Sequence, residues 1–368
     1  MEYIIKTRCL FSLVLYIRNI TIHLYFNYFL KKNMIIFLSV IYVFFLWIVL
    51  FAFLLPKYYF SELVLSFLPY IILISFLWVI ISFLSFKIFS KKNIIKFWKK
   101  MRFFLAFLFL LSWFVFFFYS KKFNYFYNVN INQIQDNMTW WLKILYANVY
   151  KNNKDYTWLM QFIEEKNPDL IMFVEFADHH YENLKNFLND NYPYSNSMHW
   201  SKTYVWNMVF SKQKIENWAD DFPQWAWRYW YFSVNYEDKP IYFYLVHMSS
   251  PISKKFFDMR NKQIDYFFED FSIHQKFHRI KNDKVVAIGD FNTSPWSIFY
   301  QNFAKWFEWE YINITRSLPI VFTRKSFIAP FLWSHIDHIF INKFVKITDF
   351  SVVSIPDSDH RWFLFNIK

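Results

Sequence analysis

Polar side chains able to hold a metal ion or a phosphate follow apolar runs at several points in the second half of the chain. The clearest case is Val285–Ser297, VVAIGDFNTSPWS, in which an apolar run leads directly to Asp290 and Asn292. Near the C-terminus, the triplet SDH supplies Asp359 and His360. A carboxylate, an amide and a histidine gathered at strand ends can together hold a divalent ion and a phosphate. The pattern therefore predicts metal-assisted hydrolysis of a phosphate ester.

Four more candidate residues occupy similar positions. Asn148 ends LKILYAN, Glu175 ends LIMFVE, His247 ends IYFYLVH, and Asp337 stands in SHIDHIF. An unpaired buried carboxylate is costly, so an acid at the end of an apolar run indicates a ligand. The alternatives are an exposed strand-end acid at Glu175, a turn-forming asparagine at Asn148 and a buried core histidine at His247.

From Trp141 onward, short apolar runs alternate with polar stretches of helical period, which predicts an α/β fold. The mixture is too rich in strands for a helical bundle and too irregular for a (β/α)₈ barrel, so a pair of packed sheets with helices outside is expected. The predicted strands are Lys143–Val149, Leu170–Glu175, Tyr204–Ser211, Tyr229–Tyr236, Ile241–His247, Lys284–Asp290, His335–Ile341 and Trp362–Ile367. The predicted helices are Tyr156–Lys166, Asp178–Asn189 and Lys254–Phe271.

Residues 142–368 resemble the endonuclease/exonuclease/phosphatase superfamily, whose type is pancreatic deoxyribonuclease. The motifs GDFN, IDH and SDH, in that order and spacing, carry the resemblance. It implies a four-layer α/β sandwich of two mixed β-sheets flanked by helices. Three apolar segments ahead of this domain are similar to those of a bacterial membrane-anchored subgroup.

The resemblance also implies roles at the metal. Glu175 would be the main metal carboxylate, with Asn148 and Asp359 as further metal-side groups. Asp290 would orient or deprotonate the attacking water, and Asn292 would hydrogen-bond the transition state. Oxygen-rich ligands without cysteine favour Mg²⁺, with Mn²⁺ as the second choice.

Three residues are implied to act on the phosphate. His360 would contact the phosphate and transfer a proton, while Asp337 would fix its tautomer and raise its pKa. His247 would be a second phosphate-binding histidine.

Arg260 and Gln263, one turn apart on a predicted helix, would either hold an active-site loop or lie on a solvated face.

The first third of the chain contains three apolar segments, at residues 34–55, 63–86 and 103–119. Each is about long enough to cross a hydrocarbon core of roughly 30 Å as a helix. Residues 87–102 are strongly basic and contain no acid. Basic loops stay in the cytoplasm, so three crossings place the catalytic domain outside it, in a multi-pass plasma membrane protein. Lys121 and Lys122 oppose this orientation but are outnumbered.

Two segments flank these predicted spans. Residues 1–33 form an N-terminal extension that is either a surface-lying amphipathic helix or a stretch ahead of the true start, and residues 123–141 form a linker. The net charge of +13 lies entirely in residues 1–122, because the rest of the chain has equal numbers of acidic and basic residues. A neutral catalytic domain lacks the cationic surface of a high-affinity, sequence-independent DNA binder.

Three functions compete on this sequence. The first is a phosphoesterase tethered to the lipid bilayer, for which a phosphate ester in the same plane, such as a lipid-linked one, is the expected substrate. The second is a nuclease that cleaves DNA or RNA. The third is a catalytically inactive membrane binding protein, which the presence of every expected ligand disfavours.

The composition is unusual in having one glycine and 18 tryptophans, whereas globular proteins average about 7% glycine. Trp206, Trp333 and Trp362 stand where the resembling family tends to have glycine or a tight turn. A hypothesis follows that UGA codons, read as glycine in the cell, have been translated here as tryptophan. Trp296 is expected to be a genuine tryptophan. An indole cannot supply the positive φ that tight turns require.

Overall fold

The computed structural model describes a short N-terminal part and most of a C-terminal part. In the N-terminal part it describes residues 54–71, 110 and shorter pieces between 40 and 80. In the C-terminal part it describes residues 141–196, 206–217, 229–237, 239–277, 282–301, 311–316, 322–325 and 333–368. By compactness the chain divides into two units, Met1–Val64 and Leu65–Lys368.

The structure describes about half of the predicted membrane segments at 34–55 and 63–86 and almost nothing of the one at 103–119. Helix α2, Tyr59–Ser66, overlaps the start of the segment at 63–86, and only residue 110 of the segment at 103–119 is described. Among the residues that the structure describes, no helix is both long enough and apolar enough to span a bilayer. The extension at 1–33 and nearly all of the linker at 123–141 also fall outside the described ranges.

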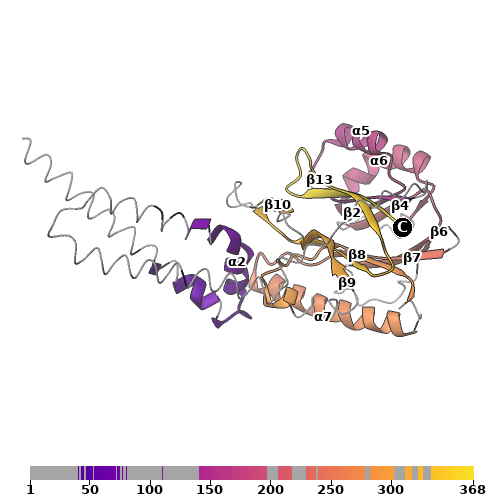
Figure 1. Ribbon diagram of the computed structural model, residues 1–368. Helices are drawn as coiled ribbons and strands as arrows, with labels where there is room; N and C mark the ends of the chain where they lie inside the picture. Colours follow the sequence, from indigo (N-terminus) through magenta and orange to yellow (C-terminus); the bar gives the residue numbers. More distant parts are fainter. Residues whose placement is uncertain are drawn as a thin grey trace, which may run out of the picture. The chain divides into compact units, whose positions relative to one another are not determined.

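Two six-stranded sheets form the centre of the C-terminal part (Figure 1). The first sheet has the order β13-β14-β1-β2-β4-β3, and the second has the order β5-β6-β7-β8-β12-β9. Both sheets are mixed, because β1 runs parallel to β2 and β7 parallel to β8 while the other pairs are antiparallel.

The strands of the first sheet are β1 (Leu142–Asn148), β2 (Leu170–Phe176), β3 (Tyr194–Ser195), β4 (Trp206–Ser211), β13 (Ile347–Ser354) and β14 (Arg361–Ile367). Those of the second are β5 (Ile215–Asn217), β6 (Tyr229–Tyr236), β7 (Lys239–His247), β8 (Lys284–Asp290), β9 (Tyr311–Asn313) and β12 (Asp337–Asn342). A separate pair consists of β10 (Arg324–Lys325) and β11 (Trp333–Ser334), and a 3₁₀ turn covers Ile314–Arg316.

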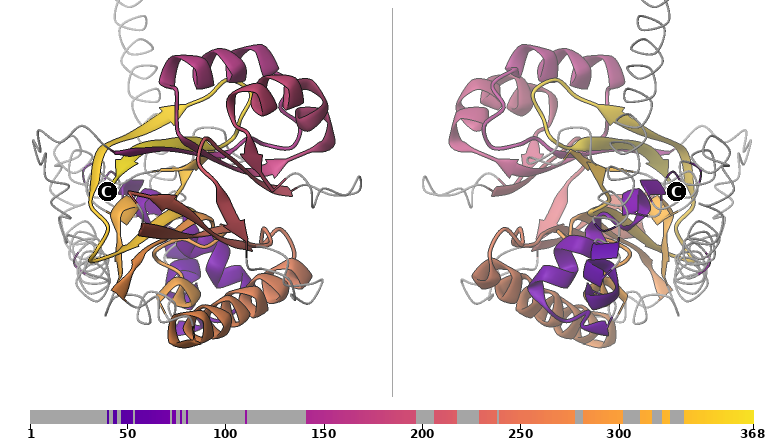
Figure 2. Two further views of the ribbon diagram at one scale, coloured as in Figure 1. Left: turned by 90° about the vertical axis from the view of Figure 1, so that its right-hand side faces the viewer. Right: turned by 90° about the vertical axis from the view of Figure 1, so that its left-hand side faces the viewer.

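Helices cover the outer face of each sheet. One apolar core, which includes Ile144 and Ile288, lies between the two sheets. Helices α5 (Tyr156–Lys166) and α6 (Asp178–Asn191) pack on the first sheet, and helix α7 (Lys254–Phe277) packs on the second. Figures 1 and 2 show α5 and α6 on one side of the paired sheets and α7 on the other. The predicted α/β sandwich of two mixed sheets flanked by helices is confirmed.

Local sequence accounts for the element bounds that matched the prediction. Helix α5 begins after Asp155, whose carboxylate accepts a hydrogen bond from the Trp158 backbone N–H at 3.1 Å. It ends at Asn167, which adopts the left-handed conformation with φ of 46°. Asparagine tolerates that conformation, and the proline that follows cannot continue a helix. Strands β6 and β8 likewise have the predicted bounds.

Several short or edge strands had no sequence signal. Strand β13 lies at the edge of the first sheet and is largely half-buried or exposed along its length. Its register with β14 shifts between Thr348 and Ser351, and Asp349 in between has φ of 52°. A bulge breaks the two-residue alternation from which strands are recognised, so this strand was not predicted.

The described tryptophans do not have the backbone conformation that would require glycine. None of them has positive φ; the non-glycine residues that do are Tyr150, Asn167, Glu175, Glu237, Asn292, Asp349 and Asp357. Trp362 is buried, and its Nε1 donates to the Asn148 backbone oxygen at 3.0 Å. The argument that these positions need glycine for a tight turn is therefore wrong at the tryptophans that the structure describes.

Candidate active site

The candidate residues meet where the two sheets end. Asn148 is the last residue of β1, and Glu175 lies near the end of β2, which runs parallel to β1. His247 and Asp290 are the last residues of the parallel strands β7 and β8, and they face each other in the register of that pair. Parallel strands carry their C-terminal residues to the same edge, which brings the residues together in pairs, Asn148 with Glu175 and His247 with Asp290. The packing of the two sheets brings the two pairs together.

Asn148 connects the two sheets at this edge. Its Nδ2 lies 3.2 Å from Glu175 Oε1, 3.3 Å from Asp290 Oδ2 and 3.3 Å from His360 Nε2. Its Oδ1 accepts a hydrogen bond from the Tyr150 backbone N–H at 3.0 Å. Asn148 therefore presents an amide donor to the cluster, whereas its oxygen is occupied by the chain that follows.

His360 is held by a carboxylate that a tyrosine holds in turn. His360 Nδ1 lies 2.9 Å from Asp337 Oδ2, and the Tyr146 hydroxyl donates to Asp337 Oδ1 at 2.7 Å. With Nδ1 facing Asp337, Nε2 is turned toward the cluster and lies 3.7 Å from Asp290 Oδ2. Tyr146 was not among the residues predicted for the site. The signal was available, since residues two apart in a strand share a face and Tyr146 precedes Asn148 by two.

Burial and charge shift the proton equilibria of this group. Burial by itself lowers the pKa of His360, but the charges of Asp337 and Asp290 and the hydrogen bond to Asp337 outweigh it and raise the pKa to about 9. Burial, reinforced by the charge of Asp337, raises the pKa of Asp290 to about 8. Burial together with nearby carboxylates also raises the pKa of Tyr146 well above its usual value. His360 is thus cationic at neutral pH, and Tyr146 remains a hydroxyl donor.

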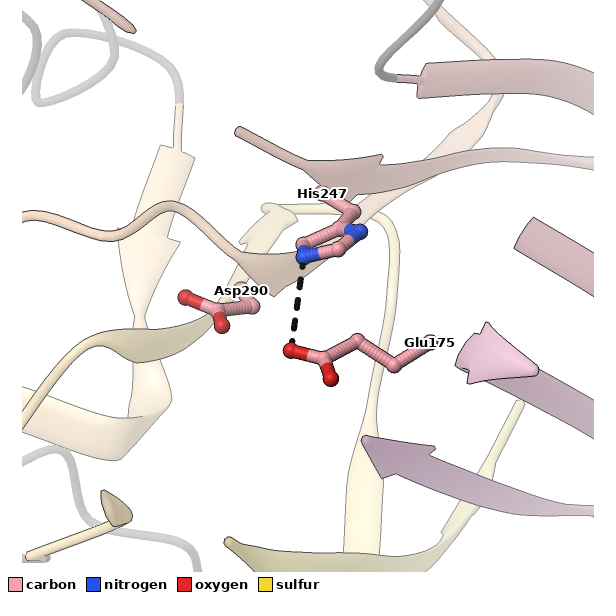
Figure 3. Close-up of side chains that lie close together, drawn as sticks. All are labelled: Glu175, His247 and Asp290. Atoms are coloured by element: carbon pink, nitrogen blue, oxygen red, sulfur yellow. Dashed lines mark ion pairs between the residues drawn. The ribbon is translucent and has the colours of Figure 1, made fainter. Parts of the chain in front are cut away.

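Glu175 reaches the cluster from a distorted stretch of β2. The pairing of β2 with β4 is irregular between Phe173 and Phe176, and Glu175 has φ of 56°. Its Oε1 lies 3.8 Å from His247 Nε2 (Figure 3), and its Oε2 accepts from the Lys151 backbone N–H at 3.2 Å. Burial opposes ionisation, but the charges of His247 and His360 lower the pKa of Glu175. This carboxylate is therefore ionised and available as a ligand.

The donor set fits a hard divalent cation. One ligand atom each from Glu175, His247 and Asp290 lie within 4.8 Å of one another, and so do those from Asp290, Asp337 and His360. Asn292 Oδ1 is buried and has no hydrogen-bond partner among the described residues. A cation beside Asp290 would favour its ionised form and offset the burial that raises its pKa. Oxygen ligands with one imidazole suit Mg²⁺ or Mn²⁺.

The GDFN motif has a steric reason for its glycine. A Cβ added to Gly289 would lie 1.9 Å from the Val246 backbone oxygen, so β8 approaches β7 more closely than any side chain permits. The chain then turns at Asn292, which has φ of 48° and whose backbone N–H donates to Asp290 Oδ1 at 2.8 Å. The turn fixes the Asp290 carboxylate relative to the strand end.

Two residues of α7 hold the loops around this turn. Arg260 is fully buried, and its Nη1 donates to the Asn292 backbone oxygen at 2.7 Å. Gln263 is buried as well, and its Oε1 accepts from the Ser249 backbone N–H at 2.9 Å, just after His247. Of the two interpretations of this pair, the structure supports the one in which they hold active-site loops.

Asp359 lies beside the cluster in a different arrangement from the one the sequence suggested. Its Oδ2 accepts from Arg324 Nε at 3.3 Å, and it belongs to neither group of potential metal ligands among the described residues. The carboxylates of Asp290, Asp359 and Glu175 raise the pKa of Arg324 in spite of its burial. Arg324 had no sequence signal, because β10 consists of two residues and lacks a pattern.

The contacts of His338 indicate a structural role. It is fully buried, its Nε2 lies 2.9 Å from the Thr293 backbone oxygen, and its Nδ1 lies 3.2 Å from Asn313 Nδ2. Its side chain lies on the opposite face of β12 from that of Asp337, as expected for adjacent strand residues. His338 therefore holds the loop after β8 through Thr293 and does not belong to the cluster.

Comparisons with solved structures find similar chains at low sequence identity. TDP2 of D. rerio, complexed with a single-strand DNA product, is 13% identical and has a TM-score of 0.48, with 62% of this chain and 100% of that chain covered. The mannosyl-6-phosphatase Bt3783 of Bacteroides thetaiotaomicron is 16% identical and has a TM-score of 0.43, with coverage of 62% and 99%. The curated proteins include no match.

The sequence also matches a family model over residues 145–360, a range that contains every residue of the cluster described above. This range is more than half of the chain. The chain belongs to the endonuclease/exonuclease/phosphatase family.

Proposed function

We propose that this protein is a membrane-anchored phosphoesterase that uses Mg²⁺, or alternatively Mn²⁺, and hydrolyses a phosphate ester by attack of water. Members of its family are metal-dependent hydrolases of phosphate esters. The observation that carries the proposal is the convergence of Asn148, Glu175, Asp290 and His360, which draws on both sheets.

Each side chain has a task that follows from its surroundings. Glu175, Asp290 and His247 would hold the ion, which would supply positive charge to offset that of the phosphoryl oxygens and would favour deprotonation of the attacking water. Asp290, ionised beside the cation, would also orient the attacking water. His360, cationic at neutral pH, would donate a hydrogen bond from Nε2 to the phosphoryl group and supply a proton to the leaving oxygen.

Two asparagines complete the site. The Asn148 amide nitrogen faces two carboxylate oxygens, those of Glu175 and Asp290, and would donate to a phosphoryl oxygen when substrate is bound. Asn292 donates its amide to the Met248 backbone oxygen at 2.9 Å, and its buried Oδ1, which has no hydrogen-bond partner among the described residues, would accept from a substrate donor or contact the cation. Asp359, held by Arg324, would act on the substrate side and not as a metal ligand.

The membrane location rests on the N-terminal residues. Several large apolar side chains between residues 40 and 55 are exposed, among them Phe44, Trp47 and Leu54 at 67%, 65% and 69%. Several large exposed apolar side chains on one short segment favour contact with a membrane or a partner. Together with the basic segment at 87–102, it supports a multi-pass plasma membrane protein whose catalytic domain lies outside the cytoplasm. A substrate in the plane of that membrane, such as a lipid-linked phosphate, would then be favoured.

The test is hydrolysis by the full chain in detergent, with p-nitrophenyl phosphate, bis(p-nitrophenyl) phosphate, a phosphatidyl lipid and plasmid DNA as substrates. We expect ester hydrolysis that a chelator abolishes, that Mg²⁺ restores, and that Glu175→Gln and His360→Gln reduce. Glu182→Gln, at a surface carboxylate paired with Lys185, is the control. Cleavage of DNA alone would make the protein a nuclease. No hydrolysis under any metal condition would make it an inactive binding protein.

A further inference from the structure

Arg324 and His360 lie opposite each other in a short antiparallel bridge. Strand β10 lies against the segment before β14, where Arg324 and His360 form an isolated antiparallel bridge. Two backbone hydrogen bonds flank this bridge, from the Lys325 N–H to the Asp359 oxygen and from the Arg361 N–H to the Thr323 oxygen, both 2.7 Å. Residues directly opposite in an antiparallel pair project to the same face. The Arg324 side chain therefore projects to the face on which His360 meets Asn148 and Asp290.

Two anchors hold the Arg324 guanidinium. Its Nε donates to Asp359 Oδ2 at 3.3 Å, and its Nη1 lies 3.5 Å from Ser250 Oγ, in the loop that follows His247. The side chain retains 29% exposure. Its Nη2 has no hydrogen-bond partner among the residues that the structure describes. The guanidinium is thus oriented at one edge and has donors left over at the other.

The chemistry of this placement favours an oxyanion. A guanidinium is always charged, and its planar set of donors matches the oxygens of carboxylate and phosphate. Asp359 engages one edge of Arg324, and its second oxygen, Oδ1, is buried without a partner among the described residues. The Asp359 carboxylate therefore satisfies only one of the Arg324 guanidinium donors, Nε. A phosphoryl group near His360 would engage the remainder.

We propose that Arg324 contacts the substrate and donates a hydrogen bond to a nonbridging oxygen of the phosphoryl group, and that Asp359 is the positioning residue that orients its guanidinium. The proposal rests on the proposed function in one respect, namely that the ligand of this site is a phosphoryl group. It assigns the affinity for that group to a residue outside the metal cluster. Monoesters and diesters share the chemistry, and the experiment distinguishes them.

The test compares Arg324→Gln and Arg324→Lys with Lys325→Gln in the full chain. Lys325 is the matched control, because it is the adjacent cation of the same short strand and projects to the other face. With p-nitrophenyl phosphate, bis(p-nitrophenyl) phosphate and Mg²⁺, we measure kcat, KM and the inhibition constant of inorganic phosphate.

Losing a charge-assisted hydrogen bond should raise the inhibition constant of phosphate roughly 10- to 100-fold in Arg324→Gln. Arg324→Lys should recover part of this loss, and Lys325→Gln should differ from the wild type by less than about two-fold. A larger effect on the monoester than on the diester would identify a terminal phosphate as the preferred group. An equal effect would identify the shared phosphoryl oxygens.

A purely structural role for Arg324 gives a different result. In that case Asp359→Asn and Arg324→Gln would lower the unfolding temperature alike and leave the inhibition constant of phosphate unchanged, which overturns the proposal. If Arg324→Gln does not fold, Arg324→Lys retains the charge and decides the question through the same constant.

The experiment also separates this inference from the proposed function. If the wild type hydrolyses no ester, the proposed function fails, and calorimetric titration with inorganic phosphate and Mn²⁺ still tests Arg324. Phosphate binding that Arg324→Gln removes and Lys325→Gln retains would then support the inference alone. Absence of phosphate binding by the wild type would overturn both.

Discussion

Replacement of Tyr146 by phenylalanine tests the hydrogen-bonded group that holds His360. The substitution deletes the hydroxyl that donates to Asp337 Oδ1 at 2.7 Å. Both side chains are fully buried, so water cannot replace the lost donor. The carboxylate oxygen is then left buried and unpaired, which costs roughly 2–3 kcal/mol for an acceptor that carries charge. A loss of this size lowers Tm by roughly 4–12 °C in a domain of about 150–250 residues.

The same substitution should reduce turnover. Asp337 would be held on one side only, by His360 Nδ1 at 2.9 Å, and His360 would lose part of its fixed orientation. We expect kcat to fall roughly ten-fold with little change in KM, because small displacements of a catalytic group lower the rate and leave substrate binding intact.

Tyr192→Phe is the matched control. Its hydroxyl is also buried, but it donates to a neutral acceptor, the Pro168 backbone oxygen, at 3.1 Å. We expect a cost of about 1 kcal/mol and an unchanged kcat. Urea unfolding of the metal-free protein and initial rates with Mg²⁺ provide the two measurements. Equal destabilisation by both substitutions, or full kcat in Tyr146→Phe, would refute the reasoning.

Three further predictions concern neighbouring residues. The stability of the metal-free protein should fall as pH rises from about 6.5 to 9, because the folded state raises the pKa of His360 to about 9 and holds a proton that the unfolded chain releases; a flat urea midpoint over this range would contradict it. Asp290→Asn should lower kcat roughly 10²- to 10⁴-fold and yet stabilise the metal-free protein at pH 8, since it removes a buried acid with a raised pKa of about 8; a loss of stability in the same unfolding assay would count against it. Gly289→Ala should impair folding, because its Cβ would lie 1.9 Å from the Val246 backbone oxygen, and a soluble variant with wild-type Tm would disprove the close approach of β7 and β8.

Many of the site residues could be predicted from the sequence because they stand at the ends of apolar strands. The apolar runs before Asn148, Glu175, His247 and Asp290 identify each strand, and each parallel pair carries its two residues to one edge of its own sheet. The motifs and the family resemblance predicted that these residues share one site, but they gave no local signal for the individual contacts. Their grouping depends on contacts such as that between Asn148 and His360, which are 212 residues apart.

Other parts of the site had no local signature. Glu175 points into the cluster because a bulge places it in the left-handed region, which an acidic residue adopts only when surrounding structure imposes it. Asp359 was expected as a metal-side carboxylate, and the structure adds a partner that the sequence did not indicate, the Arg324 guanidinium. That pairing follows from the isolated bridge between Arg324 and His360, and two-residue strands leave no periodicity to detect.

The sequence by itself determined the strands and helices with strong local codes, such as the capped helix Tyr156–Lys166 and the apolar strand Lys284–Asp290. It also determined which polar residues stand at the ends of those strands. Only the tertiary structure decided which of them meet, how Tyr146 and Arg324 join them, and which carboxylates acquire shifted pKa values. Periodicity and capping depend on neighbours a few residues away, whereas the distances and burial that create chemistry depend on how the two sheets pack against each other.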